Sequence, residues 1–338
     1  MAMNKKLIAL TLAALPAAAM ADVTIFGTLK AGFENVKDKG TSSVNNVADF
    51  GSRIGFKGNE DLGNGLKAIW QIQSRASLTG DSTARNTFGS RNTFIGLQGG
   101  FGKVRLGNVS DYADSDMAIV NPWESEAAAL QLEIGNNRSP LDTRLKNSVR
   151  YDSPDFGGFD FSLQHGVNEG KNLGVFDEEN NRRVNLVGLG YTAGGLTAKY
   201  VFARWDYKNG VGSELDNTRY QRAEVGYNFD FGLNLVGAYS QNNDREVDGS
   251  KIKDRQAAVT ATYTVGAFTP KFSYGKGWDT KSAGVSAPDT GYDQYIVGVD
   301  YALSKRTTAG VSFGKLDNDK NYGEPDQRAA GVQMIHQF

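Results

Sequence analysis

Charged side chains offer the most chemistry in this 338-residue chain, and their signs separate along it. The segment 108–143 carries seven acids and one base, a net charge of −6. The acids are Asp111, Asp114, Asp116, Glu124, Glu126, Glu133 and Asp142, and the base is Arg138. A segment of one sign attracts counter-ions or pairs with bases elsewhere in the chain.

Bases dominate the strand-like segments on either side of this acidic segment. Apolar residues there alternate with polar ones, and the polar face carries eleven bases against two acids, Glu34 and Asp49. The bases are Lys30, Arg53, Lys57, Lys67, Arg75, Arg91, Lys103, Arg105, Arg144, Lys146 and Arg150. Opposite charges are therefore expected to face each other across one interior.

The sequence gives little support for a nucleophilic or metal site. The chain has no Cys, which excludes thiolate nucleophiles, thiolate zinc sites and disulfides. Its two histidines, His165 and His336, share a face with outward apolar residues, so no triad is expected. The stretch GGFGKVRLGN at 99–108 lacks the GK[ST] ending of a phosphate loop. We therefore expect no enzyme, cofactor or metal site, although an enzyme that uses a pair of carboxylates stays open. The net charge of −1 does not favour nucleic acid as a partner.

The dominant pattern is a period of two, which predicts β-strands. In the first strand Val23, Ile25 and Phe33 fall on one face and Thr24 and Lys30 on the other. Sixteen such segments are predicted: 22–35, 49–60, 65–77, 90–99, 102–109, 144–153, 158–166, 184–193, 196–206, 219–229, 233–243, 254–265, 268–278, 290–301, 306–316 and 328–338. Most have the length, about 9 to 11 residues, that a tilted strand needs to cross a bilayer.

The connections differ at the two ends of these strands. Short turns such as Gly99-Gly100 and Gly194-Gly195 alternate with long polar stretches such as 36–48, 167–183 and 279–289. Aromatic residues cluster near strand ends. A soluble sandwich or propeller also shows alternation, but two unlike rims and aromatic girdles are typical of outer-membrane barrels. We predict an all-β, 16-stranded antiparallel transmembrane barrel with short periplasmic turns and long extracellular loops, whose mean hydropathy of −0.44 averages a lipid face and a water face.

Both ends of the chain fit export to a membrane. Residues 1–21 combine a cationic start, an apolar run and Ala19 and Ala21 around Met20, which predicts a secretory signal cleaved before Asp22. The alternative is an N-terminal core helix. Residues 22–338 then form the barrel domain, and Phe338 ends a strand that we expect to close the barrel against the first.

Several motifs resemble the trimeric general-diffusion porins of the neisserial and beta-proteobacterial type. They are DVTIFGTLKAGFE at 22–34, GSRIGFKGNEDLGNGLKAIWQ at 51–71, RNTFIGLQGGFGKVRLGN at 91–108, NPWES at 121–125 and SVRYDSPDFGG at 148–158. The resemblance implies a homotrimer among the lipids of a Gram-negative outer membrane. It also implies a third loop, about 108–143, that folds inward, and passive diffusion of ions and small hydrophilic solutes.

The charge separation then acquires a role at the narrowest point of a channel. We expect Arg53, Arg91, Arg105, Arg144 and Lys146 to face Asp114, Asp116, Glu124 and Glu126 there, with the other bases lining the lumen. Such a transverse field would orient dipolar solutes and set ion preference, whose sign the residues leave open. Trp123, Ala127 to Leu130 and Ile134 should pack the loop on the inner wall. A substrate-specific channel, a barrel adhesin and an outer-membrane enzyme are the alternatives.

Overall fold

The computed structural model describes residues 23–80, 88–117, 119–134, 141, 143–167, 182–207 and 215–338. The predicted signal segment 1–21, Arg138, Asp142 and most of the loop 167–183 lie outside the described residues.

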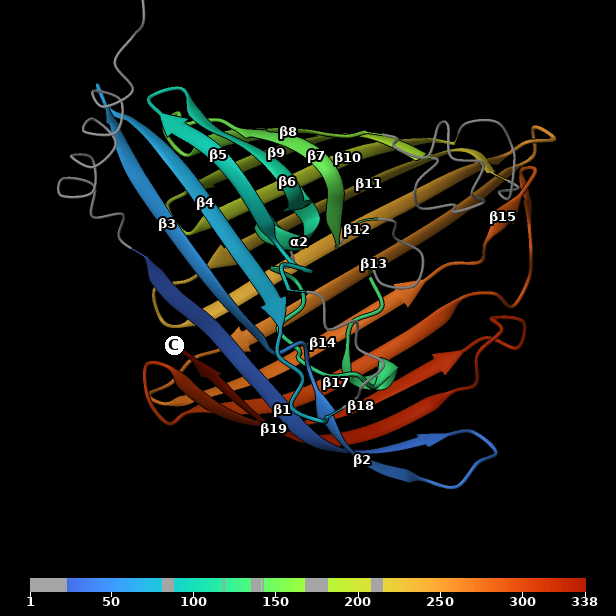
Figure 1. Cartoon of the computed structure of the whole chain (residues 1–338). Helices are drawn as coiled ribbons and strands as arrows, with labels where there is room; N and C mark the ends of the chain where they lie inside the picture. The colour runs from blue at the N-terminus through green and yellow to red at the C-terminus, as the bar shows by residue number, and fades with distance from the viewer. Residues whose placement is uncertain are drawn as a thin grey trace, which may run out of the picture.

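Within the described residues, sixteen antiparallel strands close into a barrel, as predicted (Figure 1). They are β1 (Thr24–Asp38), β3 (Arg53–Gly63), β4 (Leu66–Arg75), β5 (Thr93–Gly99), β6 (Gly102–Ser110), β7 (Arg144–Asp152), β8 (Phe159–Gly166), β9 (Arg182–Ala193), β10 (Leu196–Tyr207), β11 (Leu215–Asn228), β12 (Leu233–Glu246), β13 (Lys251–Tyr263), β14 (Phe268–Gly277), β17 (Tyr292–Ala302), β18 (Thr307–Asn318) and β19 (Gln327–Gln337).

The alternation of apolar and polar residues gives the barrel wall an outer and an inner face. On β12, Leu235 and Tyr239 are exposed, whereas the alternate residues Val236, Ala238 and Ser240 are buried on the inside. Since neighbouring residues of a strand point to opposite faces, the exposed apolar side chains form a continuous outer band. An apolar outside and a filled or polar inside reverse the usual arrangement of a water-soluble protein.

Pairs of aromatic side chains border this outer band at two levels. The rings of Phe268 and Tyr301 contact each other near the short-turn end of β14, with centroids 4.8 Å apart. Toward the long-loop end, Tyr239 and Trp278 lie 6.3 Å apart. Because Tyr prefers the interface between water and hydrocarbon, these pairs mark two membrane boundaries.

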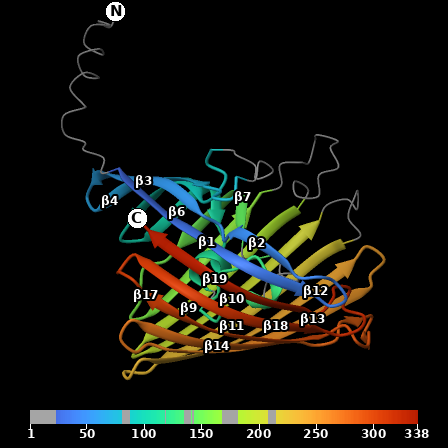
Figure 2. The ribbon, with the colours of Figure 1, turned by 90° about the horizontal axis from the view of Figure 1, so that it is seen from below.

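The barrel closes through its first and last strands. β1 pairs with β19 over eleven residue pairs, from Thr28↔Gln337 to Asp38↔Gln327. Beyond them, Gly27 N–H donates to the Phe338 carbonyl at 3.0 Å, and Phe338 N–H donates to the Gly27 carbonyl at 3.1 Å. The Phe338 ring occupies the space where a side chain at position 27 would lie, which requires Gly27. The predicted closure at Phe338 is confirmed (Figure 2).

Three short strands were not predicted. β2 (Val44–Asp49) folds back on the outer half of β1, so the predicted loop 36–48 contains part of a hairpin and the second barrel strand begins at Arg53. β15 (Lys281–Ser282) and β16 (Val285–Ser286) form a second hairpin around Ala283 and Gly284, both with positive φ. These segments are too short and polar for alternation to reveal them.

The third long connection contains the described helical segments, α2 (Tyr112–Asp116) and the 3₁₀ turn η1 (Ala128–Leu130). Neither is long and apolar enough to cross a membrane as a helix. The connection leaves β6 at Ser110 and returns at Arg144, close to the predicted limits 108–143. It lies inside the barrel, where α2 and η1 are seen through the opening (Figure 1).

Candidate pore constriction

Loop 3, defined as residues 111–143, enters the lumen through a capped turn. Asp111 is fully buried and accepts hydrogen bonds from the N–H groups of Asp114, at 2.9 Å, and Thr143, at 3.0 Å. The carboxylate thus caps the start of α2 and ties the two ends of the loop together. Asp111 therefore has a structural role and does not face a passing solute.

Apolar side chains hold loop 3 against the far wall. Trp123, Leu130 and Ile134 are buried in one cluster with the inward residues Val236, Ile296 and Leu316. The Trp123 Nε1–H also donates to Ser273 Oγ of β14 at 2.8 Å. The predicted packing of Trp123, Ala127 to Leu130 and Ile134 on the inner wall is confirmed, since each is buried or packed against this cluster.

Amide side chains of the wall then bond the backbone of the loop. Gln294 Nε2 donates to the carbonyls of Ala128 and Gln131, both at 2.8 Å. Gln327 Oε1 accepts the Ala129 N–H at 2.9 Å. A side chain at Gly314 would overlap the Ala129 carbonyl, so the absent side chain lets η1 lie directly on β18. The loop is fixed by packing and by directional bonds.

All four acids predicted for the constriction form ion pairs with bases of the wall. Glu124 pairs with Lys30, and Glu126 lies 3.7 Å from Arg75. Asp114 lies 3.7 Å from Arg144, and Asp116 lies 2.5 Å from Arg150. The acidic loop therefore faces the basic wall as expected, but through direct contacts. Only Arg144 among these partners belongs to the five bases predicted for the constriction.

Arg150 is an anchor of loop 3. Its side chain is only 1% exposed and pairs with Asp116 and with Asp152, at 2.5 Å and 2.7 Å. It also donates to the Ser110 carbonyl at 2.9 Å and to Ser115 Oγ at 2.7 Å. A buried guanidinium needs this many partners to offset its lost hydration.

Arg105, which was predicted at the constriction, shares the same network. It is 8% exposed and its Nη2 lies 2.6 Å from Asp152, so it is enclosed in the wall and does not border the opening. Asp152 is an inward acid in addition to the predicted Glu34 and Asp49. Its position two residues beyond Arg150 on the same strand face was the available signal.

Arg53, Arg75, Arg91 and Arg144 form a cluster of like charge beside loop 3. Arg53 and Arg75 lie directly opposite each other on β3 and β4. The charges of Arg144 and Arg53 act unfavourably on the half-buried Arg91, whereas Asp114 acts favourably. Among the described residues, no carboxylate lies within 4.0 Å of Arg53 or Arg91. Uncompensated bases held together are costly, which indicates a function beyond stability.

The turn that precedes Arg53 is fixed by Asp49. Its carboxylate accepts the N–H groups of Gly51 at 2.9 Å, Ser52 at 2.7 Å and Leu78 at 2.7 Å. Burial disfavours the charged carboxylate, but these bonds favour it. Asp49 therefore positions the basic cluster and does not act as a free inward charge.

The prediction that Lys146 faces the lumen was wrong. β7 has a bulge in which Asn147 takes a positive φ of 51°, and the register shifts opposite Gly107 and Val109. Beyond the bulge Leu145 is the buried inward residue, which leaves Lys146 exposed on the other face. Arg144 reaches Asp114 from the end of the strand. A bulge that adds one residue to a strand does not show in the alternation of apolar and polar residues.

The remaining predicted bases lie nearer the short-turn end. Lys57 lies over the inward Phe26 ring, 5.2 Å from its centroid. Lys67 pairs in register with Gln98, which in turn lies opposite Lys103. These three bases share the inward face, as predicted, but lie away from loop 3.

The inward aromatic side chains next to loop 3 are buried. Trp205 and Tyr220 of the wall are buried together with Tyr112 of α2, and Tyr292 is buried against η1. They form the packing surface of loop 3. Such enclosed rings cannot provide an aromatic track for a sugar.

A closed barrel with an outer apolar band, aromatic borders and a charged interior narrowed by an inserted loop defines an outer-membrane channel. The model of the Gram-negative porin family matches residues 7–321, and the chain belongs to that family. The major outer membrane protein P.IB of Neisseria meningitidis serogroup A is 39% identical over 344 residues, covering 99% of this chain and 100% of the relative. The same-named protein of Neisseria lactamica is 40% identical over 349 residues, with equal coverage.

A solved structure agrees in fold. The anion-selective porin from Comamonas acidovorans has a TM-score of 0.78 and 25% identity, covering 94% of this chain and 100% of that one. The protein is thus an outer-membrane porin and not an enzyme. It forms a water-filled channel for the passive diffusion of ions and small hydrophilic solutes.

Proposed function

We propose that the opening beside loop 3 prefers anions, because its acids are neutralised and part of its bases are not. Asp114, Asp116, Glu124 and Glu126 each have a basic partner on the wall. Arg53 and Arg91 keep their positive charge without a carboxylate within 4.0 Å among the described residues. That difference is the observation that carries the proposal.

The charges act only at short range. At physiological salt the Debye length is about 8 Å, so a base affects a passing ion only where the channel is narrow. Loop 3 is the segment that narrows this barrel, and Arg53, Arg75, Arg91 and Arg144 lie beside it. The similarity to a porin whose name describes it as anion-selective supports the same sign.

The test is the zero-current potential across a planar bilayer under a KCl gradient. The wild-type protein should give the sign of an anion-preferring channel, and Arg53→Ser with Arg91→Ser should shift it toward the cation side. Lys305→Ser with Arg306→Ser removes the same charge from the exposed turn between β17 and β18 and serves as the control. If the two double variants shift the potential equally, or neither does, the arginine cluster does not set the preference.

We propose further that the channel is a homotrimer formed through the outer faces of β1, β3, β5 and β6. This surface carries the exposed aliphatic residues Ile25, Ile54, Ile95, Leu97 and Leu106. The paired aromatic residues that mark a lipid boundary lie instead on β7 and β8 and from β11 to β17. Electrophoresis without heating should show a trimer that Ile95→Asp with Leu106→Asp dissociates into monomers.

The N-terminal segment 1–21 is proposed to be a secretory signal, on its cationic start and small residues before Asp22. The mass of the protein purified from outer membranes tests this, since a mature chain should begin at Asp22. A chain that retains Met1 in the membrane would contradict it.

A further inference from the structure

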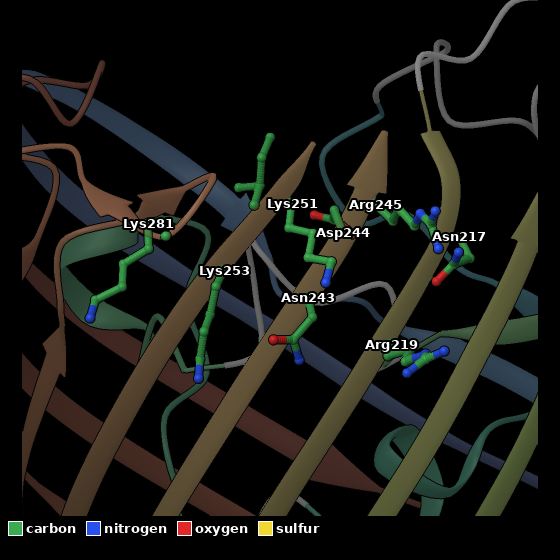
Figure 3. Close-up of a pocket in the computed structure, with 10 residues that line it drawn as sticks. Asn217, Arg219, Asn243, Asp244, Arg245, Lys251, Lys253 and Lys281 are labelled. Atoms are coloured by element: carbon green, nitrogen blue, oxygen red, sulfur yellow. The ribbon is translucent and has the colours of Figure 1, made fainter. Parts of the chain in front are cut away.

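A basic cavity lies on the long-loop end of β11, β12 and β13, away from loop 3. It has a volume of about 480 Å³ and is lined by ten residues (Figure 3). Five of them are bases: Arg219, Arg245, Lys251, Lys253 and Lys281. Figure 3 shows these side chains around the ends of neighbouring strands.

Strand register places the cavity on the outer face of the barrel. Arg219, Asn243 and Lys253 lie side by side across β11, β12 and β13. Val225, Gly237 and Val259 lie side by side across the same strands, each six residues nearer the short-turn end. An even separation keeps residues on one face. Because Val225 and Val259 are both 52% exposed in the outer apolar band, the basic residues face outward too.

The acids nearby do not neutralise this cavity. Asp244, which also lines it, belongs to the opposite strand face and accepts hydrogen bonds from Thr218 Oγ1 at 2.5 Å and Asn242 Nδ2 at 2.8 Å. Asp216 lies 3.8 Å from Arg245, with both side chains more than half exposed. An exposed pair of this kind is weak. The cavity therefore keeps a positive surplus and suits an anionic group.

The level of the cavity is that of a lipid headgroup. Tyr239 and Trp278, 6.3 Å apart, border the apolar band just below it, and Arg255 lies over the Trp278 ring at 5.6 Å. Aromatic rings occupy the boundary of the hydrocarbon. Asn243 is four residues beyond Tyr239, about 13 Å along a strand and less along the membrane normal because strands are tilted.

A separate apolar groove lies on the same strands, nearer the short-turn end. It has a volume of about 410 Å³ and is lined by residues of β11 to β14, including Val225, Leu235, Gly237, Val259 and Phe272. A Cβ at Gly237 would meet nothing within 4 Å, so the glycine leaves the groove open. Six residues separate Gly237 from Asn243, about 20 Å along the strand, which an acyl chain can span.

We propose that this surface binds a phosphorylated lipid of the outer leaflet. Its phosphate groups would lie among Lys251, Lys253, Lys281 and the neighbouring arginines, and one acyl chain would lie in the groove at Gly237. Guanidinium and ammonium groups hold phosphate through charge-assisted hydrogen bonds. The combination of a basic cavity and an apolar groove on the same strands favours a lipid over a free anion.

The experiment measures binding of diphosphoryl lipid A to the purified channel in detergent by native mass spectrometry, with free pyrophosphate as the second probe. The triple variant Lys251→Gln, Lys253→Gln, Lys281→Gln should bind lipid A on the order of tenfold more weakly. Gly237→Leu should weaken binding of lipid A and leave pyrophosphate unaffected. Lys305→Gln with Arg306→Gln, which removes two bases from the opposite rim, is the control, and single-channel conductance checks that each variant is folded.

Two outcomes overturn the proposal. Unchanged affinity for lipid A in the triple lysine variant removes the headgroup site. Pyrophosphate that binds as tightly as lipid A, with Gly237→Leu without effect on either, makes the cavity a site for anions from water. Loss of lipid A binding in the triple variant together with a selective effect of Gly237→Leu supports it.

Discussion

Replacing Gly314 should push loop 3 into the channel. A Cβ at this position would lie 2.7 Å from the carbonyl carbon of Ala129, whereas ordinary contacts begin at 3.4 Å. The carbonyl oxygen of Ala129 would lie nearer still, so either η1 or β18 must move by more than 0.7 Å. β18 is bonded to β17 and β19 along its length, so the loop is the part that yields.

The displacement has a definite cost. Moving Ala129 by 0.7 Å away from the wall stretches its 2.9 Å bond to Gln327 to about 3.6 Å, beyond hydrogen-bond range. Loss of that bond costs about 1 kcal/mol, and overpacking of this kind costs about 1–3 kcal/mol in all. The channel should fold, with a lower thermal midpoint.

Single-channel conductance in planar bilayers measures the effect on the opening. Gly314→Ala should lower the conductance and Gly314→Val should lower it further, because the branched side chain needs more room. Gly237→Ala, at an outward position with nothing within 4 Å, should change neither conductance nor stability. Conductance that is unchanged or higher in Gly314→Val would show that the wall moves and not the loop.

Three further outcomes follow from the contacts of the loop and the rim. Trp123→Ala removes a buried ring and its bond to Ser273, so it should cost about 3–5 kcal/mol and, by loosening loop 3, give larger and noisier conductance steps. Arg150→Gln leaves Asp116 without its base and Asp152 with Arg105 alone, and should lower thermal stability by about 3–5 kcal/mol, which a melting curve followed by circular dichroism would show. Lys39 donates to Asp326 at the outer rim and holds the pKa of that carboxyl below its ordinary value of 3.8. The ion pair therefore stabilises the seam between β1 and β19 above about pH 4, and this stabilisation is lost as the pH falls through the lowered pKa. Amide exchange at Lys39 should become faster over that pH range, and Lys39→Gln should abolish this pH dependence.

The barrel could be predicted from sequence because its rule is repeated at every strand. Lipid outside and water inside enforce a period of two, as in the exposed Leu235 and the buried Val236. Irregular features follow no repeat. The bulge at Asn147 reversed the orientation expected of Lys146, and the hairpin of β2 was hidden in a polar stretch. Orientation of a single side chain next to a bulge requires coordinates.

The pairing of charges could likewise be predicted only in part. Composition and alternation predicted an acidic loop and a basic wall, but they could not say which acid pairs with which base, since pairing depends on the path of loop 3. The structure pairs Glu124 with Lys30 and Asp116 with Arg150, two bases that the sequence placed outside the constriction. These ion pairs hold the loop to the wall and neutralise its negative charge. On the proposed anion preference, what remains for a passing ion is the charge that loop 3 does not neutralise, at Arg53 and Arg91, so the contacts that fix the loop would also decide the sign of the field in the opening.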